Sequence, residues 1–244
     1  MSASRRRLAA SLALDVRLQA QSKLYAIGLF AAVLLGLGTR WMLSVSESPE
    51  AYMTPALAAF YVLGVGGTTY MFGAATILME KGEGTLHALR VSPLRQREYV
   101  LSKIITLTAF ATVESAVIYF IAGGLGVSPL PLLAGVLMLG VLYTLIGLGQ
   151  SAGHDSMTSF LFPWAVLVSL IIQLPALYIV DIGPPWLWHL IPTQAPILVM
   201  LSGAQPLSVG QWIYVALMGI GSITLAALWC RARFRRHLGL TEDR

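Results

Sequence analysis

The chain has 244 residues, of which 57% are hydrophobic and 11% are charged. Soluble domains carry about 25% charged residues, so this composition excludes an ordinary soluble enzyme and indicates an integral membrane protein. The net charge of +5 does not indicate a nucleic-acid partner, because the basic residues border apolar segments, where they set orientation and meet anionic lipid.

Residues 4–22 are expected to form a helix that lies on the inner membrane surface. Apolar residues recur there at helical spacing, behind a cluster of arginines that suits lipid headgroups. Asp15 falls near the apolar face and makes the pattern imperfect, so a plain cytoplasmic lead-in to the first span is the alternative. The stripe consists of Leu8, Leu12, Leu14, Val16 and Leu18.

Six apolar segments follow, each about as long as the roughly 20 residues that cross a bilayer as a helix. All lysines and arginines except Arg40 fall on one side of these segments, which places both termini in the cytoplasm. We therefore expect an all-α, six-span integral membrane protein whose 244 residues form one transmembrane domain. The first segment lacks a cleavage pattern, so we interpret it as a retained span. The expected spans are 24–45, 52–79, 99–122, 130–150, 158–180 and 209–230.

Residues 181–208, between the last two spans, are too apolar for a solvated loop, yet prolines break them into pieces too short to span. Broken backbone is tolerated at membrane depth only where protein or a water cavity covers it. We therefore expect short re-entrant helices in the outer leaflet. An aromatic belt at that interface would contain Trp41, Trp186, Trp188 and Trp212.

The cytoplasmic loop 80–98, between spans two and three, has the strongest local pattern. Gly82 and Gly84 allow a sharp exit from span two, and Thr85 is a suitable cap for a short helix over 83–91. Ser92 followed by Pro93 is typical of a boundary that ends this helix and starts the next one. A short rigid helix held between two long ones could transmit a push from a soluble partner.

This loop resembles that of the permease subunits of type-2 ABC exporters. There, a Glu-x-x-x-Gly-Thr-Leu segment is followed by Pro-Leu-Arg, an acidic-aromatic pair and a lysine. The residues 191–196 before the last span resemble the family's re-entrant segment, and overall spacing is most similar to small permeases of actinobacterial fluoroquinolone-type multidrug exporters. The matching loop residues are Glu80, Gly84, Thr85, Leu86, Pro93, Leu94, Arg95, Glu98, Tyr99 and Lys103.

The resemblance implies a dimer of six-span units, with an identical or paralogous second permease, bound to two ABC ATPase subunits in a bacterial cell membrane. The sequence contains no G-x-x-x-x-G-K-[ST] loop, so ATP and Mg would be bound by the ATPase partner and this chain would be a non-catalytic subunit without a cofactor. The loop would dock into the ATPase as a coupling helix. We assign that coupling to Glu80, Glu83, Gly84, Thr85, Leu86, Leu89, Arg90, Pro93 and Arg95.

In the resembled family, spans two and five line the transport path at the dimer axis. Lipid-facing or helix-packing side chains are the alternative interpretation, and we expect no more than half of the candidates to line a cavity. Aromatic and aliphatic walls with few polar groups would suit flat amphipathic drugs. The candidates are Tyr61, Thr68, Tyr70, Phe162, Trp164 and Gln173, together with Glu114 of span three.

Glu114 lies about 15 Å along span three from Ile104, near the bilayer midplane. Intramembrane acids are candidate functional residues. Three interpretations stay open: Glu114 pairs with Arg40, it is protonated and bonds a neighbouring helix, or it faces a wet cavity and attracts cationic substrate. Arg40 could equally extend to the outer headgroups.

No metal centre is expected. The only cysteine, Cys230, cannot form an internal disulfide or a thiolate site, and His154 with Asp155 in one short turn supply too few ligands. A solvated turn is the simpler interpretation of that pair.

The sequence thus predicts the permease of an ATP-driven exporter, in contact with membrane lipid and carrying a small hydrophobic or amphipathic molecule. Export of lipid, glycan or peptide by the same architecture is an alternative. An ion-coupled secondary transporter using Glu114 is another, although the absence of an internal repeat disfavours it. A membrane assembly or immunity protein without transport activity is the third.

Overall fold

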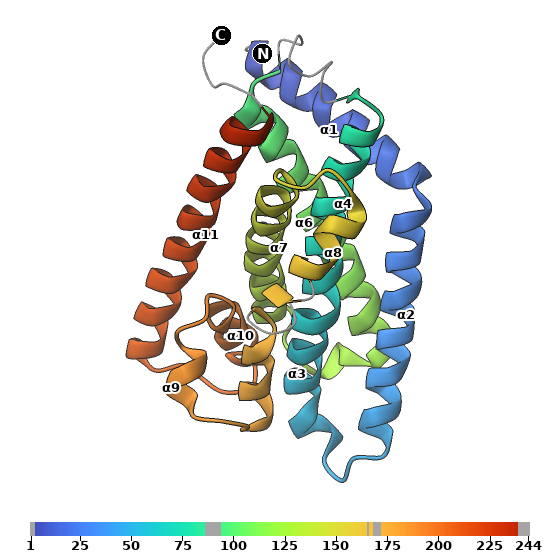
Figure 1. Cartoon of the computed structure of the whole chain (residues 1–244). Coiled ribbons are helices and arrows are strands. Elements are labelled where there is room, and N and C mark those ends of the chain that lie inside the picture. Colours follow the sequence, from blue (N-terminus) through green and yellow to red (C-terminus); the bar gives the residue numbers. More distant parts are fainter. Residues whose placement is uncertain (1–2, 86–93, 165, 168–171, 239–244) are drawn as a thin grey trace.

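The computed structural model describes residues 3–85, 94–164, 166–167 and 172–238, and this part of the chain is a helical bundle without β-strands (Figure 1). Five of its helices are long and apolar enough to cross a membrane. They agree with five of the six expected spans. The first is α2 (Lys23–Ser44) and the second is the continuous run α3 (Pro49–Phe60), η1 (Tyr61–Val65) and α4 (Gly66–Gly82). The others are α6 (Gln96–Ala122), α7 (Pro129–Ser151) and α11 (Val209–Leu238).

The second span is not a uniform α-helix. A single π-helical turn, η1, interrupts it at a segment that contains Gly64, and Thr69 Oγ1 donates to the Val65 carbonyl just beyond the turn, at 2.7 Å. Isolated π turns inside α-helices often mark functional sites. The π turn contains Tyr61 and lies close in the sequence to Thr68, and both are candidate path residues.

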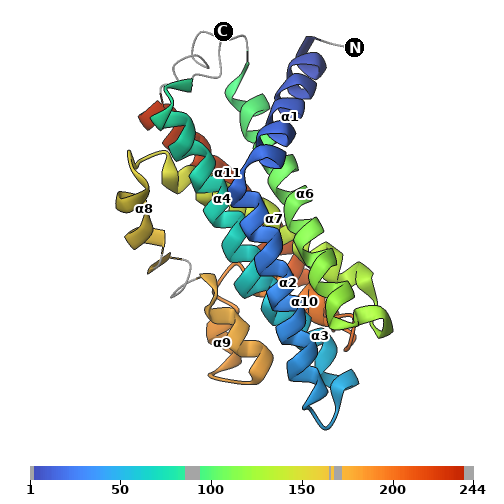
Figure 2. The ribbon, with the colours of Figure 1, turned by 90° about the vertical axis from the view of Figure 1, so that its right-hand side faces the viewer.

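The described parts of the segment 158–180, the expected fifth span, are α8 (Met157–Trp164), the π-helical residues 166–167 and 172, and the 3₁₀ helix η4 (Leu174–Val180). Figure 2 shows α8 on one flank of the bundle. Residue 165 and residues 168–171 lie outside the described residues. A sixth span and the membrane topology therefore stay predictions.

The N-terminal segment is helical, as expected: α1 covers Ala3–Gln21. The expected single apolar stripe is wrong in detail. Asp15 is buried against the bundle at 5% exposure, whereas Leu14 and Leu18 are 58% and 50% exposed. The helix therefore turns a mixed face towards α6 and leaves part of its apolar surface open, because Asp15 finds buried partners that the sequence pattern could not show.

The helix after the coupling loop begins later than expected. Its N-cap is Arg95, and the Arg95 N–H donates to Glu98 Oε2 at 3.1 Å. The described helix α6 therefore begins at Gln96, after the boundary that the sequence predicts at Ser92 and Pro93, and the Glu98 carboxylate satisfies a free N–H at its start. Ser92 and Pro93 themselves lie outside the described residues.

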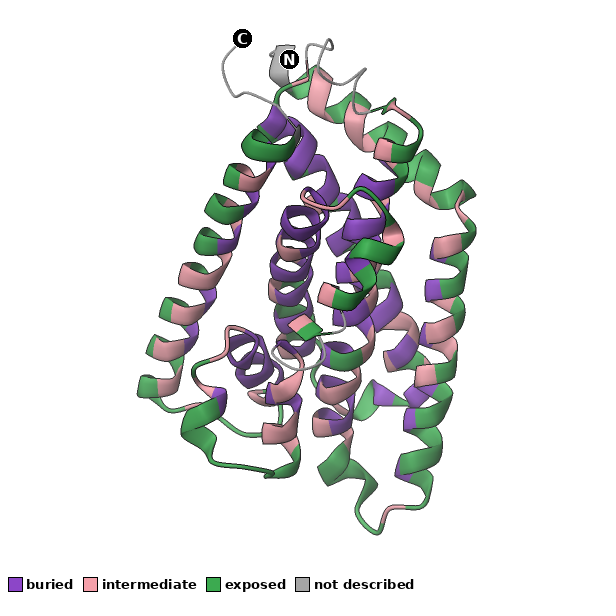
Figure 3. Cartoon of the chain, in the orientation of Figure 1, coloured by how far each residue is buried: buried purple, intermediate pink, exposed green. Residues whose placement is uncertain are grey.

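The stretch 181–208 contains two short helices, as expected, α9 (Pro185–Trp188) and α10 (Gln194–Leu201). α10 is almost entirely buried, against α7 and α11 (Figure 3). Trp188 is also buried, at 5% exposure, and its indole N–H donates to the Ile182 carbonyl at 3.0 Å. A membrane position for these helices stays a prediction. The remaining short element is η2 (Gly124–Gly126).

The core lies around α7, whose most extensive contact is with α4. Gly147 makes this approach possible, since a Cβ there would lie 2.5 Å from the Tyr70 carbonyl oxygen. Small residues let helix backbones approach closely where the surrounding lipid is as apolar as the side chains. The close contact of α4 with α7 fixes the helix that enters the coupling loop.

Candidate functional site

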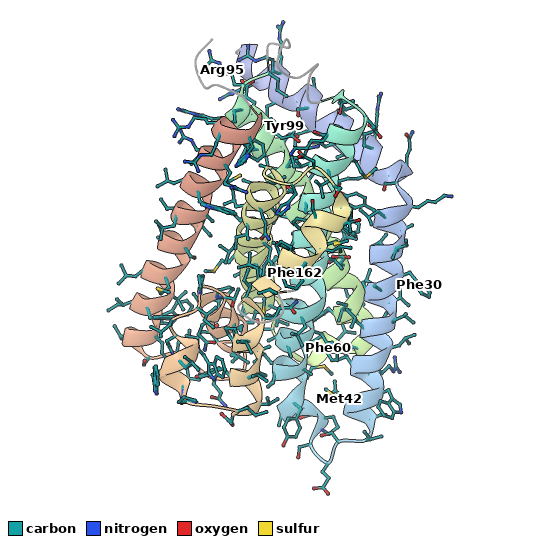
Figure 4. All side chains as sticks on the ribbon, viewed as in Figure 1. Phe30, Met42, Phe60, Arg95, Tyr99 and Phe162 are labelled. Atoms are coloured by element: carbon teal, nitrogen blue, oxygen red, sulfur yellow. The ribbon has the colours of Figure 1, made fainter. Side chains whose placement is uncertain are left out.

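One end of the bundle carries most of the basic residues, and we call it the basic end. It contains α1, the last turns of α4 and α11 and the first turn of α6 (Figure 1). Arg95 and Tyr99 are seen there in Figure 4. The described ends of the coupling loop, Glu83–Thr85 and Leu94–Arg95, leave the bundle at the same place.

A buried ammonium group joins three helices at the basic end. The Lys103 side chain, 4% exposed, lies on α6, and its Nζ contacts Asp15 Oδ1 of α1 at 2.6 Å and Glu80 Oε1 of α4 at 2.7 Å. Both carboxylates have a second donor: Tyr99 O–H donates to Glu80 Oε2 at 2.6 Å, and Ser102 O–H donates to Asp15 Oδ2. We call Asp15, Glu80, Tyr99, Ser102 and Lys103 the Lys103 cluster. Each of the carboxylate oxygens of Asp15 and Glu80 therefore accepts a hydrogen bond.

A second ion pair fixes α1 to the start of α6. The Arg7 Nε and Nη2 atoms donate to the two Glu98 carboxylate oxygens, each at 2.9 Å. This fork geometry is specific to arginine. The hydrogen bond to Glu98 raises the pKa of Arg7 above its ordinary value. Since Glu98 also accepts from the Arg95 N–H, one carboxylate holds α1 and caps α6.

Lys81 ties the last turn of α4 to the turn between α7 and α8. Its Nζ donates to the Ala152 carbonyl at 2.9 Å and to the His154 carbonyl at 2.7 Å, and lies 3.5 Å from Asp155 Oδ1. Burial, followed by the nearby Arg233 and Lys81 charges, lowers the pKa of His154. The turn is thus braced through its carbonyls rather than simply solvated. In the described part of the chain, no three His, Cys, Asp or Glu residues gather as a metal site.

The predicted coupling residues differ in their surroundings. Glu80 belongs to the Lys103 cluster, whereas Glu83, Thr85 and Arg95 are exposed. Gly84 has a φ of +73°, which glycine adopts at low cost, so the sharp exit from α4 is present. Thr85 Oγ1 donates to the Glu80 carbonyl at 3.0 Å. Leu86, Leu89, Arg90 and Pro93 lie outside the described residues.

The two path tyrosines are packed inside the helix bundle. Tyr61 is 2% exposed and donates to the Ser115 carbonyl at 3.0 Å. Tyr70 is fully buried, donates to Gln150 Oε1 at 2.5 Å and stacks on Phe160 with 5.7 Å between ring centroids. In this single chain both rings therefore contribute to helix packing.

The described path candidates of the fifth segment are more exposed than these tyrosines. Phe162 is 77% exposed on α8 (Figure 4), and Gln173 Nε2 donates to the Leu63 carbonyl of the π turn at 2.9 Å. The side chain of Trp164 lies outside the described residues. Gln173 thus joins the fifth segment to the interrupted part of span two.

The structure brings Thr68 and Glu114 together. Thr68 Oγ1 lies 2.8 Å from Glu114 Oε2 and 3.0 Å from the Val65 carbonyl. A hydroxyl has one proton. If Thr68 donates to Val65, its bond with Glu114 requires a proton on the carboxyl, which is the second of the three interpretations made above. Glu114 Oε1 is buried without a hydrogen-bond partner among the described residues.

Pairing of Glu114 with Arg40 is not present. Glu114 packs against Gly28, since a Cβ on Gly28 would lie 2.8 Å from Glu114 Oε1. Arg40 is twelve residues further along α2, which is about 18 Å at 1.5 Å per residue. Arg40 is exposed, and no ion pair joins it to Glu114 in the described structure.

Sequence reasoning missed Asp15 as a structural partner and gave Lys103 and Tyr99 no role of their own. One signal was available: a lone acid on the apolar side of an amphipathic helix needs a buried cation. The sequence does not say which cation supplies it.

Comparisons with known proteins agree with this architecture. The model of the fluoroquinolones export permease protein family matches residues 6–240. Two relatives, each named fluoroquinolones export permease protein and each from a strain of Mycobacterium tuberculosis, are 29% identical over 227 residues, covering 93% of this chain and 92% of the relative. The resemblance to small permeases of fluoroquinolone-type exporters is confirmed. The chain belongs to the fluoroquinolones export permease protein family.

Proposed function

We propose that this chain is the membrane permease of an ATP-driven ABC exporter for hydrophobic or amphipathic drugs. It acts as a dimer in a bacterial cell membrane, with ATP hydrolysis on a separate subunit. The family match and the five membrane-length helices support a multi-pass export permease. The names of the relatives support a drug as cargo. The missing phosphate-binding loop supports a separate ATPase.

The Lys103 cluster is the observation that carries the coupling mechanism. Glu80 lies in the last turn of α4, at the start of the loop 80–98, and is tied through Lys103 to both α6 and α1. A force applied to the loop by an ATPase would therefore act on α1, α4 and α6 together rather than on α4 alone. Two arrangements of these helices would give the inward-open and outward-open states, and ATP binding would favour one of them.

The test uses a charge placed on the loop. Leu86→Asp should abolish ATP-dependent drug uptake into inverted membrane vesicles and reduce co-purification of the ATPase, because it removes the expected apolar contact. The matched control is Leu125→Asp, at a 78% exposed leucine in the η2 turn. Both variants should reach the membrane in wild-type amounts. Wild-type uptake by Leu86→Asp would contradict the coupling role.

An ion-coupled transporter is the second candidate, and the buried, partly unsatisfied Glu114 carboxyl is what favours it. Dissipating the proton gradient at constant ATP separates the two mechanisms. Uptake that continues supports the ABC exporter, and uptake that stops supports ion coupling through Glu114.

A further inference from the structure

A cavity of about 690 Å³ opens at the basic end between the α1–α2 elbow and the last turns of α4. Its apolar walls come from Leu18, Leu24, Leu78, Met79 and Met157, on four helices. Sites for drug-sized ligands have volumes of about 300–1,000 Å³ and mostly apolar walls with a few polar groups. The cavity is distinct from the Thr68–Glu114 pair and from the predicted path residues, none of which lines it.

The charged groups of this cavity favour a cation. Asp15, Glu80 and Glu83 line it, against Lys23 and Lys103, which leaves one negative charge in excess. The Lys103 ammonium is held between Asp15 and Glu80. Glu83 lines the cavity and is exposed, and no hydrogen bond or ion pair joins its carboxylate to another described residue. An incoming ammonium group could approach Glu83 without displacing a partner.

The position of the cavity selects an amphipathic ligand. Its walls include the first turn of α2, beginning at Lys23, and the last two turns of α4, from Ala75 to Glu80. These are the ends of two membrane-length helices, so the cavity lies where the apolar part of the bundle meets its charged end. A molecule with an apolar body and a protonated amine occupies the same boundary in a bilayer.

We propose that this cavity is the access site for amphipathic amines that reach the permease from the inner leaflet. The apolar body would lie against Leu18, Met79 and Met157, with the ammonium group directed towards Glu83 and Glu80. The proposal rests on the export function above and adds the substrate class and the point of access. An anionic phospholipid is the less suitable occupant, because its phosphate would meet the excess carboxylate.

The test measures binding of rhodamine 6G, a cationic amphiphile, to the purified complex in nanodiscs without nucleotide, by fluorescence anisotropy. Met79→Trp fills the cavity from a side chain that is 52% exposed, so the core is not disturbed. We expect its Kd to rise about tenfold or more. Leu37→Trp, at 51% exposure on α2 outside the cavity, is the matched control and should bind as the wild type does.

Two further variants distinguish the effects of cavity shape, cavity charge and misfolding on binding. Leu18→Trp fills the same cavity from α1 and should also weaken binding, which excludes local misfolding at Met79 as the cause. Glu83→Gln should weaken rhodamine 6G binding several-fold. Fluorescein, an anion of similar shape, should bind the wild type more weakly than rhodamine 6G does.

Unchanged rhodamine 6G binding in both tryptophan variants would overturn the proposal. So would a co-purifying phospholipid that both variants lose while they keep the amine, because the cavity would then be a lipid site. A failure of the proposed export function would give a different experimental result. The expected binding pattern without ATP-dependent transport in vesicles would refute the exporter and leave the cavity as an amine site.

Discussion

Replacing Lys103 with methionine should strongly destabilise the bundle. Methionine keeps much of the side-chain length but removes the cation shared by Asp15 and Glu80, whose side chains are 5% and 15% exposed. Removing one partner of a buried ion pair costs about 3–5 kcal/mol, because the remaining charge stays uncompensated. For a chain of this size, about 2–4 °C per kcal/mol predicts a fall in Tm on the order of 10 °C.

Cys230 provides the assay. It is the only cysteine in the chain, and it is completely buried between α11 and α7. A thiol-reactive fluorophore therefore reacts when the bundle opens, and its labelling curve against temperature reports unfolding in detergent. Lys23→Met, at an exposed lysine of the same end, is the control and should melt close to the wild type.

The same charges allow a rescue. Adding Asp15→Asn and Glu80→Gln to Lys103→Met removes all three charges, and the triple variant should recover much of the lost stability, since a neutral set leaves no unpaired ion. A Lys103→Met protein that melts within about 2 °C of the wild type would refute the reasoning. It would mean that water or lipid headgroups already compensate the two carboxylates.

Two further predictions concern other parts of the bundle. Gly147→Ala should destabilise the protein by about 1–3 kcal/mol, because its Cβ meets the Tyr70 backbone at 2.5 Å, whereas Gly38→Ala, with nothing within 4 Å, should be neutral or stabilising; the Cys230 labelling curves of the two variants check this. The lowered pKa of His154 means that the unfolded chain binds its proton first as pH falls, so stability should decrease below about pH 6.5. The His154→Gln variant should lose stability less steeply between pH 7 and 5.5 than the wild type, and equal slopes would contradict this.

The long helices were predictable because hydropathy is a local property. An apolar run of membrane length must satisfy its backbone internally, and a helix does this from the sequence alone. The bounds of α2 and α7 agree with the expected spans within one or two residues. The segment 158–180 was expected as a span for the same reason, but residue 165 and residues 168–171 lie outside the described residues, so this span stays a prediction.

The charge partners were not predictable, because each depends on which helices become neighbours. Asp15 seemed to weaken the amphipathic pattern of α1, and its partner Lys103 lies 88 residues away. One interpretation of Glu114 was a pair with Arg40, but α2 presents Gly28 at that level instead. The vertical register of α2 against α6 decides this, and hydropathy carries no information about register.

The Lys103 cluster and the cavity share Asp15, Glu80 and Lys103, and this sharing has a thermodynamic consequence for the two proposals. An ammonium ligand that attracts Glu80 competes with Lys103 for the same carboxylate. A ligand that shifts the equilibrium between the two arrangements of α4 and α6 must bind one arrangement more tightly than the other. The factor by which the ligand shifts this equilibrium equals the ratio of its two affinities. Loop movement that separates Glu80 from Lys103 would then change the affinity of the cavity for an amine. Coupling between nucleotide and drug would require only one shared carboxylate at the junction of α1, α4 and α6.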